Sequence, residues 1–362
     1  MPVGCEGRIA GATLRAVRET LGLTQEDLAE TLDADRNTVK GWETGRRPLG
    51  ARSHRKVISL ERALRRLGAP ADLVRALDVA ADADWLLGHL LTLEVVDPAD
   101  HPLAGAVTTR DLSEMLAWPL TGRTPPPLGT GHRAPVLAAD ERNLLLDSLR
   151  RAAEASLVRR RTGDDSGPLL RRQAAYFAGT WGHPDDGWLR ELERVERQRA
   201  GRLDRWSPSW VSLRSIAVAH SIHGDPEPLR AFIAEGLASD AVDRANLNYW
   251  AYWTGETPYA DHATDLFMVD PEGDQWRGTG LLRRLVAALD RTTPYLDLCV
   301  HSVWALVRQR AHILADDGAL TTALREKCMT LAAREDLLSP QSCRELGEIF
   351  AALRPVRLVG VA

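Results

Sequence analysis

Cysteine is scarce in this sequence, and the spacing of the few that occur argues against two common uses. Four cysteines are spread over 362 residues, at Cys5, Cys299, Cys328 and Cys343, and no two form a Cys-x-x-Cys pair. This pattern favours reduced intracellular thiols over a disulfide framework or a structural zinc site. We therefore expect neither a metal nor a cofactor.

Long apolar runs are also missing. No stretch of about 18 consecutive apolar residues occurs, and the N-terminal residues lack a charged start followed by a long apolar segment. The sequence therefore predicts a cytoplasmic protein with no membrane partner. Phosphate-binding loops, zinc-protease motifs and nucleophile elbows are absent as well, so we expect no enzymatic reaction.

A negative net charge hides a basic segment near the N-terminus. The chain has a formal net charge of -4, yet residues 1–70 hold 13 Arg or Lys against 9 Asp or Glu. Between residues 36 and 66, ten basic side chains accompany only Glu43 and Glu61. Such a local positive field attracts a polyanion, whereas the acidic remainder argues against general coating of nucleic acid.

The N-terminal segment has the periodicity and the capping residues of three short helices. Apolar residues recur at helical spacing over residues 14–21, so a first helix is expected to end near Gly22. Thr24 and Asp27 form the capping-box pattern of a second helix. Asp35 can cap a third, whose first residues are polar.

The sequence LGLTQEDLAETLDADRNTVKGWETGRRP, residues 21–48, resembles the helix-turn-helix of the Cro and phage-repressor (XRE) family. The matching positions are Leu21-Gly22-Leu23, Thr24-Gln25, Leu28-Ala29, Val39, Trp42-Glu43 and Gly45. The resemblance covers about residues 10–68. It implies a lambda-repressor-like domain that binds double-stranded DNA.

The family resemblance also implies a role for individual residues. Arg36, Asn37 and Lys40 match the base-reading positions of the third helix, where Arg suits guanine and Asn suits adenine. Arg18 and Glu43 match a mostly buried ion pair between the first and third helices. The positions that match phosphate contacts are Gln25, Thr38, Thr44, Arg46, Arg47 and Arg52.

Two positions depart from the family pattern. Asp33 occupies the turn where many relatives have Gly, and Asp enters the left-handed region more readily than most residues. Gly41 stands where relatives often extend a reading side chain. Fewer base contacts then remain, so specificity is expected to depend on Arg36 and Asn37 or on DNA shape.

Behind this domain the sequence predicts only helices, which gives an all-α fold. We expect the helix-turn-helix domain over residues 1–68, a helical extension over 69–96, and a Pro/Gly-rich linker with one short helix over 97–135. Residues 136–362 are expected to form an all-helical regulatory and dimerisation domain. Its predicted helices are 139–160, 169–180, 188–203, 209–222, 226–238, 242–253, 280–288, 295–314, 319–333 and 340–353.

Short Gly/Asp turns between these helices are typical of antiparallel helix pairs. We therefore interpret residues 136–362 as a degenerate helical-repeat array that is similar to tetratricopeptide repeats, although the period of about 34 residues is not met. Arrays of this kind supply concave surfaces for partners, and in repressors they often supply dimerisation and sensing.

Two further features of the helical region have competing interpretations. Tyr249, Trp250 and Trp253 could line a pocket for a small-molecule or peptide effector, or they could be ordinary core at helical spacing. Arg214 and His220 resemble the Arg/His signature of HEPN-type ribonucleases, but a single pair at that spacing often arises by chance.

Together these observations predict a transcriptional regulator that binds a palindromic operator in double-stranded DNA as a homodimer. One alternative is an antitoxin-like or phage-type repressor whose helical domain holds a protein partner. The other is a HEPN-like ribonuclease targeted to nucleic acid.

Overall fold

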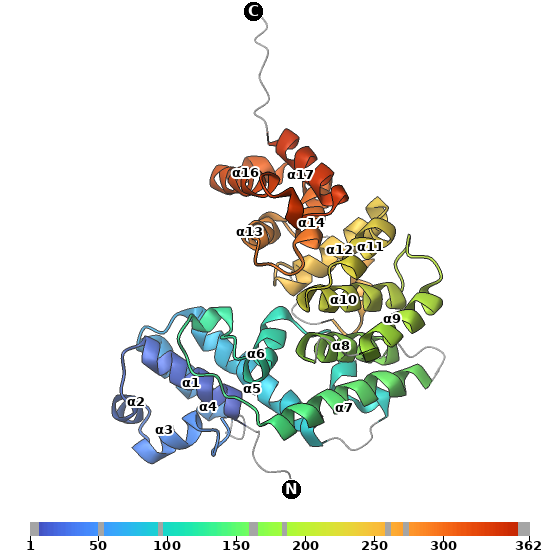
Figure 1. The fold of residues 1–362 in the computed structure, drawn as a ribbon. Helices are drawn as coiled ribbons and strands as arrows, with labels where there is room; N and C mark the ends of the chain where they lie inside the picture. The colour runs from blue at the N-terminus through green and yellow to red at the C-terminus, as the bar shows by residue number, and fades with distance from the viewer. Residues whose placement is uncertain are drawn as a thin grey trace, which may run out of the picture. The chain divides into compact units, whose positions relative to one another are not determined.

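The computed structural model describes residues 7–49, 54–92, 97–158, 166–182, 187–257, 262–270 and 275–353. Within these residues the regular structure is helical and contains no strand, which confirms the all-α prediction (Figure 1). No helix in this part of the chain combines the length and the apolar character needed to cross a bilayer.

The α-helices are α1 (Arg8–Thr20), α2 (Gln25–Thr31), α3 (Arg36–Glu43), α4 (His54–Arg66), α5 (Ala71–Thr92), α6 (Arg110–Thr121), α7 (Ala139–Val158), α8 (Ser166–Trp181), α9 (Gly187–Ala200), α10 (Pro208–Ile222), α11 (Glu227–Gly236), α12 (Asp240–Trp253), α13 (Thr279–Ala288), α14 (Leu296–Gln309), α15 (Ile313–Asp316), α16 (Gly318–Ala332) and α17 (Pro340–Ala352). They belong to two compact units. The first consists of Met1–Pro102 and Thr108–Ala155, and the second of Leu103–Val107 and Ser156–Ala362.

Helix α1 lies at the centre of the first unit, where it contacts α3, α5 and α6. Its apolar face, including Ile9, Leu14 and Val17, is fully shielded from solvent. Arg8, at the start of α1, donates two hydrogen bonds of 2.8 and 2.9 Å to Glu141 of α7. The first unit therefore includes α5, α6 and most of α7 in addition to the helices nearest the N-terminus.

Residues 97–135, which we expected to be a linker, are packed into both units. Leu103 and Val107 are buried in the second unit, and the Tyr252 hydroxyl donates to the Val107 carbonyl at 2.6 Å. Helix α6 buries Trp118 completely in the first unit. Pro and Gly density predicts breaks in helices, but it does not reveal that apolar residues between the breaks have distant partners.

In the second unit α10 contacts α8, α9 and α11, and α14 contacts α11, α12, α13 and α17. Most helix boundaries agree with the sequence prediction within a few residues, with one clear exception. The helix expected over 295–314 ends at Gln309, and the short α15 begins at Ile313. Arg310 leaves the helical conformation between them, donates to the Trp276 carbonyl at 2.7 Å and lies 4.0 Å from the centroid of that indole ring.

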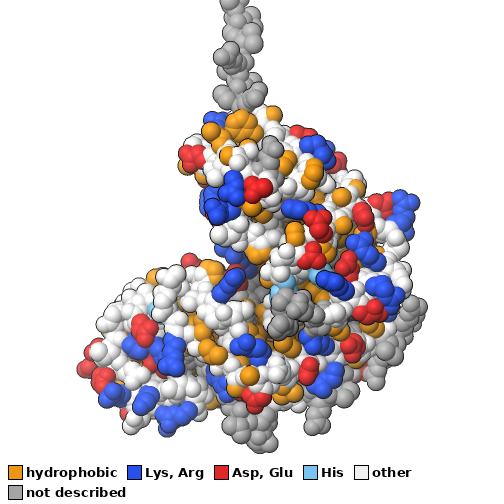
Figure 2. Space-filling model, in the orientation of Figure 1, with side chains coloured by type: hydrophobic (Ala, Val, Ile, Leu, Met, Phe, Trp, Pro, Cys, Tyr) orange, Lys and Arg blue, Asp and Glu red, His pale blue; other side chains and the backbone are white. Residues whose placement is uncertain are grey.

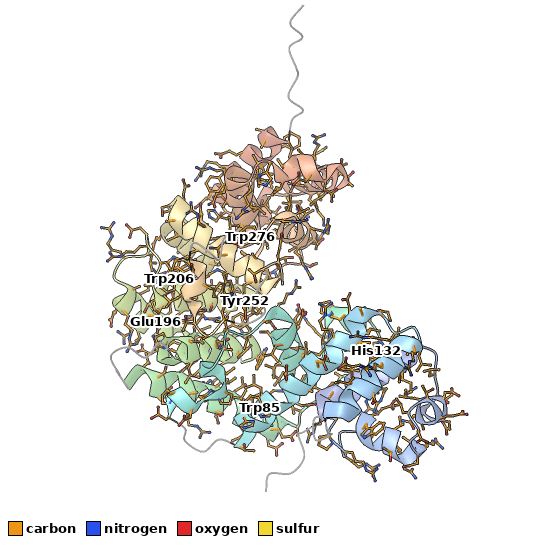
Figure 3. The ribbon with its side chains drawn as sticks, turned by 180° about the vertical axis from the view of Figure 1, so that it is seen from behind. Trp85, His132, Glu196, Trp206, Tyr252 and Trp276 are labelled. Atoms are coloured by element: carbon orange, nitrogen blue, oxygen red, sulfur yellow. The ribbon has the colours of Figure 1, made fainter. Side chains whose placement is uncertain are left out.

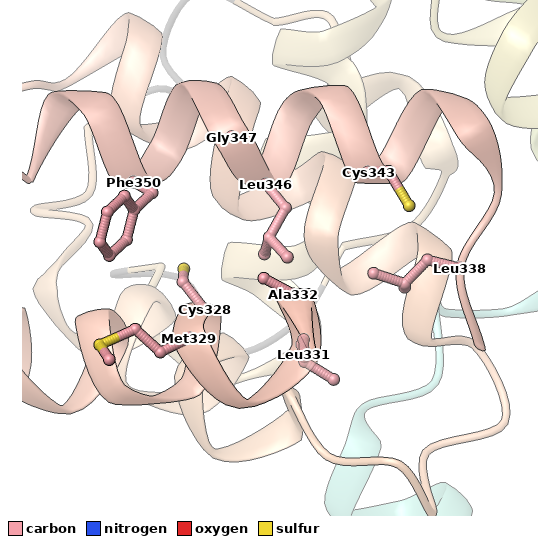
Figure 4. Close-up of a pocket in the computed structure, with 9 residues that line it drawn as sticks. All are labelled: Cys328, Met329, Leu331, Ala332, Leu338, Cys343, Leu346, Gly347 and Phe350. Carbon is pink, nitrogen blue, oxygen red and sulfur yellow. The ribbon is translucent and has the colours of Figure 1, made fainter. Parts of the chain in front are cut away.

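Helices α16 and α17 border an apolar cavity of about 330 Å³ at one end of the second unit (Figure 4). Cys328 and Met329 enter it from α16, and Cys343, Leu346 and Phe350 from α17. The Met329 side chain is largely exposed, so the cavity opens to solvent.

Candidate nucleic-acid interface

Helices α2 and α3 begin at side-chain caps, as their sequence pattern predicts. The Asp27 amide donates to the Thr24 hydroxyl at 3.1 Å, and the Thr24 amide donates to the Asp27 carboxylate at 2.8 Å, which completes a capping box. Asp35 caps α3 by accepting the Thr38 amide at 2.8 Å. Between the helices Asp33 has a φ of 49°, in the left-handed region that its identity allows.

The outer face of α3 presents polar side chains to solvent. Arg36, Asn37 and Lys40 are all exposed, whereas Val39 and Trp42 are buried against the rest of the unit. The exposed residues are the three that the family resemblance matches to base-reading positions. Their contact with bases stays a prediction.

Arg36 is held over α2 by an ion pair. Its Nε atom lies 2.7 Å from Glu26 Oε1, and the two side chains are 65% and 56% exposed. An exposed pair of this kind contributes only about 0 to 1 kcal/mol. Arg36 can therefore exchange Glu26 for another acceptor at little cost.

Arg47 lies across α3 instead of extending freely into solvent. Its Nη1 atom donates to the Thr38 hydroxyl at 2.8 Å, and its amide donates to the Gly41 carbonyl at 3.1 Å. A Cβ atom at position 41 would lie only 3.2 Å from Arg47 Cδ. Gly41, where the sequence indicated a missing reading side chain, thus leaves room for the stem of Arg47.

The other residues expected at phosphates occupy the end of α3 and the loop that follows it. The Thr44 hydroxyl donates to the Lys40 carbonyl at 2.8 Å and accepts a 3.4 Å hydrogen bond from Arg46 Nε. Both side chains are exposed. Arg52 lies outside the described residues.

Glu43 is the centre of a buried polar network under α3. Its carboxylate, which is inaccessible to solvent, accepts hydrogen bonds of 2.6 Å from Arg18 Nε and 2.6 Å from Gln25 Nε2. Arg15 donates to the Glu43 carbonyl at 3.2 Å. These bonds join α1, α2 and α3, so they fix the angle at which α3 is presented. The Gln25 amide nitrogen, expected at a phosphate, is engaged here within the protein.

Two residues that the sequence analysis did not select hold α1 in place. A Cβ atom at Gly11 would collide with the backbone of α3 at Trp42 and would lie 3.0 Å from the Glu43 carbonyl oxygen, so only glycine fits this contact. Asp84 of α5 accepts the amides of Ile9 and Ala10 at 2.9 and 2.8 Å. Burial raises the pKa of Asp84 to about 6, although these amides favour the charged form.

The surface over α2 and α3 carries many charged side chains. Figure 2 shows Lys and Arg side chains gathered at this end of the first unit, with some Asp and Glu beside them. Positive charge on a protruding helix and its following loop suits the phosphates on either side of a DNA groove.

Of the aromatic residues proposed to line a pocket, Tyr249 and Trp250 lie in the core of the second unit and Trp253 packs against it. Tyr249 and Trp250 are buried, Trp253 is half-buried, and the Tyr249 and Trp253 rings stack with centroids 6.0 Å apart. No group of three or more His, Cys, Asp or Glu residues in the described ranges is arranged to hold a metal ion.

Helix α10 directs Arg214 and His220 toward different neighbours. Arg214 donates to Asn246 of α12 at 2.8 Å, whereas His220 Nε2 lies 3.4 Å from Glu193 of α9. The two side chains of the spacing that resembles a ribonuclease signature therefore have different polar neighbours.

Comparison with known families gives a match at the N-terminus. A family model described as a helix-turn-helix domain matches residues 9–77, which include α1 except for its first residue, α2 to α4 and the beginning of α5. Neither the curated proteins nor the solved structures gave a match. The chain thus contains an N-terminal helix-turn-helix domain, the element expected of a DNA-binding regulator, within an all-helical fold.

Proposed function

We propose that this helix-turn-helix protein is a sequence-specific regulator of transcription that reads double-stranded DNA through α3, in the manner of Cro and the phage repressors. The observation that carries the proposal is the exposed row of Arg36, Asn37 and Lys40 on a helix whose other face is locked into the domain. An α-helix fits the major groove, where Arg and Asn distinguish guanine and adenine by bidentate hydrogen bonds. The proposal assigns no catalytic reaction.

Base reading by α3 is tested by Arg36→Ala and Asn37→Ala. After the preferred duplex is selected from a random library with the full-length protein, each variant should bind it about 1 to 3 kcal/mol more weakly for every bidentate pair of hydrogen bonds that the substitution removes. The preference should relax at one or two base pairs. Equal weakening on preferred and unrelated duplexes would show that these residues do not read bases.

Phosphate contact by the loop after α3 is tested through salt dependence. Arg46→Ala should reduce the slope of log affinity against log salt by about one unit while leaving the preferred sequence unchanged, because one fewer counterion is released. Arg47→Ala should do the same, but this change also removes the bond to Thr38. Arg46 is therefore the cleaner probe.

The matched control for this measurement is Arg194→Ala in the second unit, where Arg194 is exposed and paired with Glu191. This variant should keep the wild-type salt slope. A slope that is unaltered in both loop variants would contradict the assignment of Arg46 and Arg47 to phosphates.

We further propose that the protein is a homodimer on a palindromic operator and that the second unit supplies dimerisation and sensing, as a degenerate helical-repeat domain. One helix-turn-helix reads too few base pairs to compete with many weak sites, whereas two read a longer sequence. The packing of α9, α10 and α11 as neighbours, and of α16 and α17, supports a helical-repeat interpretation.

Dimerisation is tested by light scattering on the full chain and on a fragment ending at Ala155. This end point keeps all of the first unit, in which α6 packs with α1 and α5 and Glu141 of α7 accepts hydrogen bonds from Arg8 of α1. The fragment also carries Leu103–Val107, which belong to the second unit. The full chain should be a dimer that prefers half-sites about 10 base pairs apart or a multiple of that spacing. The fragment should be a monomer that binds weakly. A monomeric full chain, or a dimeric fragment with full affinity, would refute the proposal.

A further inference from the structure

Arg214 is a buried cation in the second unit for which the described residues supply no carboxylate partner. Its side chain is 4% exposed, and its Nε atom donates to Asn246 at 2.8 Å. The Nη2 atom is buried and has no hydrogen-bond acceptor. On the neighbouring α8, Arg171 pairs with Glu196, and Arg172 makes two bonds of 2.8 and 2.9 Å to Asp265. A buried charge is costly unless it is paired, so the exception at Arg214 needs a cause.

The surroundings of Arg214 add a second positive charge instead of a compensating negative one. The Arg214 guanidinium lies 4.6 Å from the centroid of the Tyr249 ring, and that of Arg172 lies 5.7 Å from the same ring. Asp265 is the carboxylate hydrogen-bonded to Arg172, so this part of the core has an excess positive charge. Burial, and to a smaller extent the nearby Arg172, lower the pKa of Arg214 to about 10, while Tyr249 acts in the opposite direction. Arg214 therefore stays charged at neutral pH.

A second unpaired donor belongs to a ring that lies against the Arg214 guanidinium. Trp250, whose ring centroid is 5.4 Å from the Arg214 guanidinium, has a buried indole N–H with no acceptor. The buried indoles of Trp276 and Trp210 in this unit are satisfied, since Trp276 donates to Asn248 at 2.9 Å and Trp210 to the Gly236 carbonyl at 2.8 Å. The half-buried Trp206 also has a buried N–H with no acceptor, but no buried cation of the described residues lies against its ring. Because buried donors are almost always hydrogen-bonded, two adjacent exceptions point to an acceptor from outside the chain.

We propose that Arg214 and Trp250 form the anion-binding part of a ligand site in the second unit, which takes the oxyanion of a small organic molecule, a carboxylate or a phosphate. Two neighbouring N–H donors, one of them on a guanidinium, match the oxygens of such a group, and the low dielectric around them strengthens the bonds. Asn246 holds the guanidinium in place, since its amide nitrogen also donates to the Ser302 hydroxyl at 3.1 Å.

Partly exposed aromatic rings border the anion-binding pair and provide apolar surface for the body of the ligand. Trp253 stacks on Tyr249, Tyr176 lies edge-on to Trp253 with centroids 6.0 Å apart, and Tyr295 lies 6.2 Å from Trp250. The rings of Tyr176, Trp253 and Tyr295 are only half-buried, so the ligand enters past them. The site lies wholly within the second unit. The proposal of a ligand site therefore does not depend on whether the first unit binds DNA.

The test measures thermal unfolding of the full-length protein with sodium benzoate, inorganic phosphate and benzamide at constant ionic strength. A molecule that binds only the folded state stabilises it by RT ln(1 + L/Kd), where L is the free ligand concentration, so the Tm keeps rising with the logarithm of the ligand concentration above the Kd. Benzoate, phosphate or both should raise the Tm with this logarithmic dependence on concentration, and the relative response shows whether a carboxylate or a phosphate is preferred. Benzamide has the same ring without the charge and should leave the Tm unchanged.

Variants assign the response to this pair of residues. Arg214→Met should abolish the response and leave the ligand-free Tm unchanged or higher, because the uncompensated cation is gone. Arg214→Lys and Trp250→Phe should each bind about tenfold more weakly or worse, through the loss of the guanidinium fork or of one donor. The matched control is Trp276→Phe at the position labelled in Figure 3. It removes an N–H that had Asn248 as its partner, and the variant should respond like the wild type.

These variants also separate a ligand site from a structural role for Arg214. If Arg214→Met does not fold, Arg214→Lys and Trp250→Phe still test the site. No anion-dependent rise in the Tm, an equal rise with benzamide, or a full response in Arg214→Met or in both conservative variants would overturn the proposal.

Discussion

Replacing Glu43 by alanine is expected to destabilise the helix-turn-helix domain by about 3 to 5 kcal/mol and to abolish DNA binding, because it removes one member of a buried ion pair. The Arg18 side chain is only 12% exposed and would lose its closest counter-charge. Gln25 would lose the acceptor of its 2.6 Å hydrogen bond at the same time. Chemical unfolding followed by circular dichroism, together with DNA binding, measures both effects.

Three further variants make the Glu43 prediction specific. Glu30→Ala, the same change on the exposed face of α2, should alter stability by no more than about 0.5 kcal/mol. Glu43→Gln keeps an oxygen acceptor without the charge and should have an intermediate effect. The double variant with Arg18→Ala should cost less than the sum of the two single changes, because both single changes remove the same interaction. Equal stability of Glu43→Ala and Glu30→Ala would contradict the prediction.

The second unit is expected to lose about 3 kcal/mol of stability as the pH rises from about 6.5 to about 9, through a single histidine. His301 is buried between α12 and α17, with Nδ1 2.8 Å from Glu345 and Nε2 3.0 Å from Asp243. Both ring nitrogens face carboxylates, so both are satisfied as donors only when the ring is protonated. Burial alone would lower the pKa of His301, but the two carboxylates outweigh it and raise the pKa to about 9.

The direction of the pH effect follows from the raised pKa of His301. Below about 6.5 the ring is protonated in both the folded and unfolded chain, and the full stabilisation is present. Between that pH and about 9 the unfolded chain releases the proton first, so unfolding becomes progressively more favourable.

Urea unfolding at pH 6 to 10 compares the wild type with His301→Gln, in which this part of the pH dependence should disappear. His312 is exposed in the same unit, so His312→Gln is the control and should keep the wild-type dependence of stability on pH. If His301→Gln does not fold, Asp243→Asn should shift the loss of stability to lower pH. If the free energy of unfolding depended on pH in the same way in the wild type and in the His301 or Asp243 variant, the prediction would be wrong.

Local features of the sequence were sufficient to predict most helices and the capping of α2 and α3. Thr24, Asp27 and Asp35 cap amides no more than three residues away. Their capping can therefore be predicted from the short sequence separation alone. The left-handed turn at Asp33 is likewise a property of one residue and its neighbours. The end of α14 at Gln309 was missed because Arg310 leaves the helix to contact Trp276, 34 residues away, and carries no Gly or Pro signal.

The tertiary structure alone decided which distant residues meet. Gly11 and Asp84 lie far apart in the sequence, yet together they set the position of α1, one by allowing the α3 backbone to approach and the other by accepting two amides. The same holds for the buried His301 with its two carboxylates. Helix propensity and capping act over a few residues, whereas these pairings form only when the apolar faces of the helices pack together. Many tertiary arrangements of the helices are compatible with the same apolar periodicity, so the sequence pattern does not select one of them. By itself the sequence therefore determined an all-α chain with an N-terminal helix-turn-helix, and the packing determined how α3 is presented and which polar groups are buried.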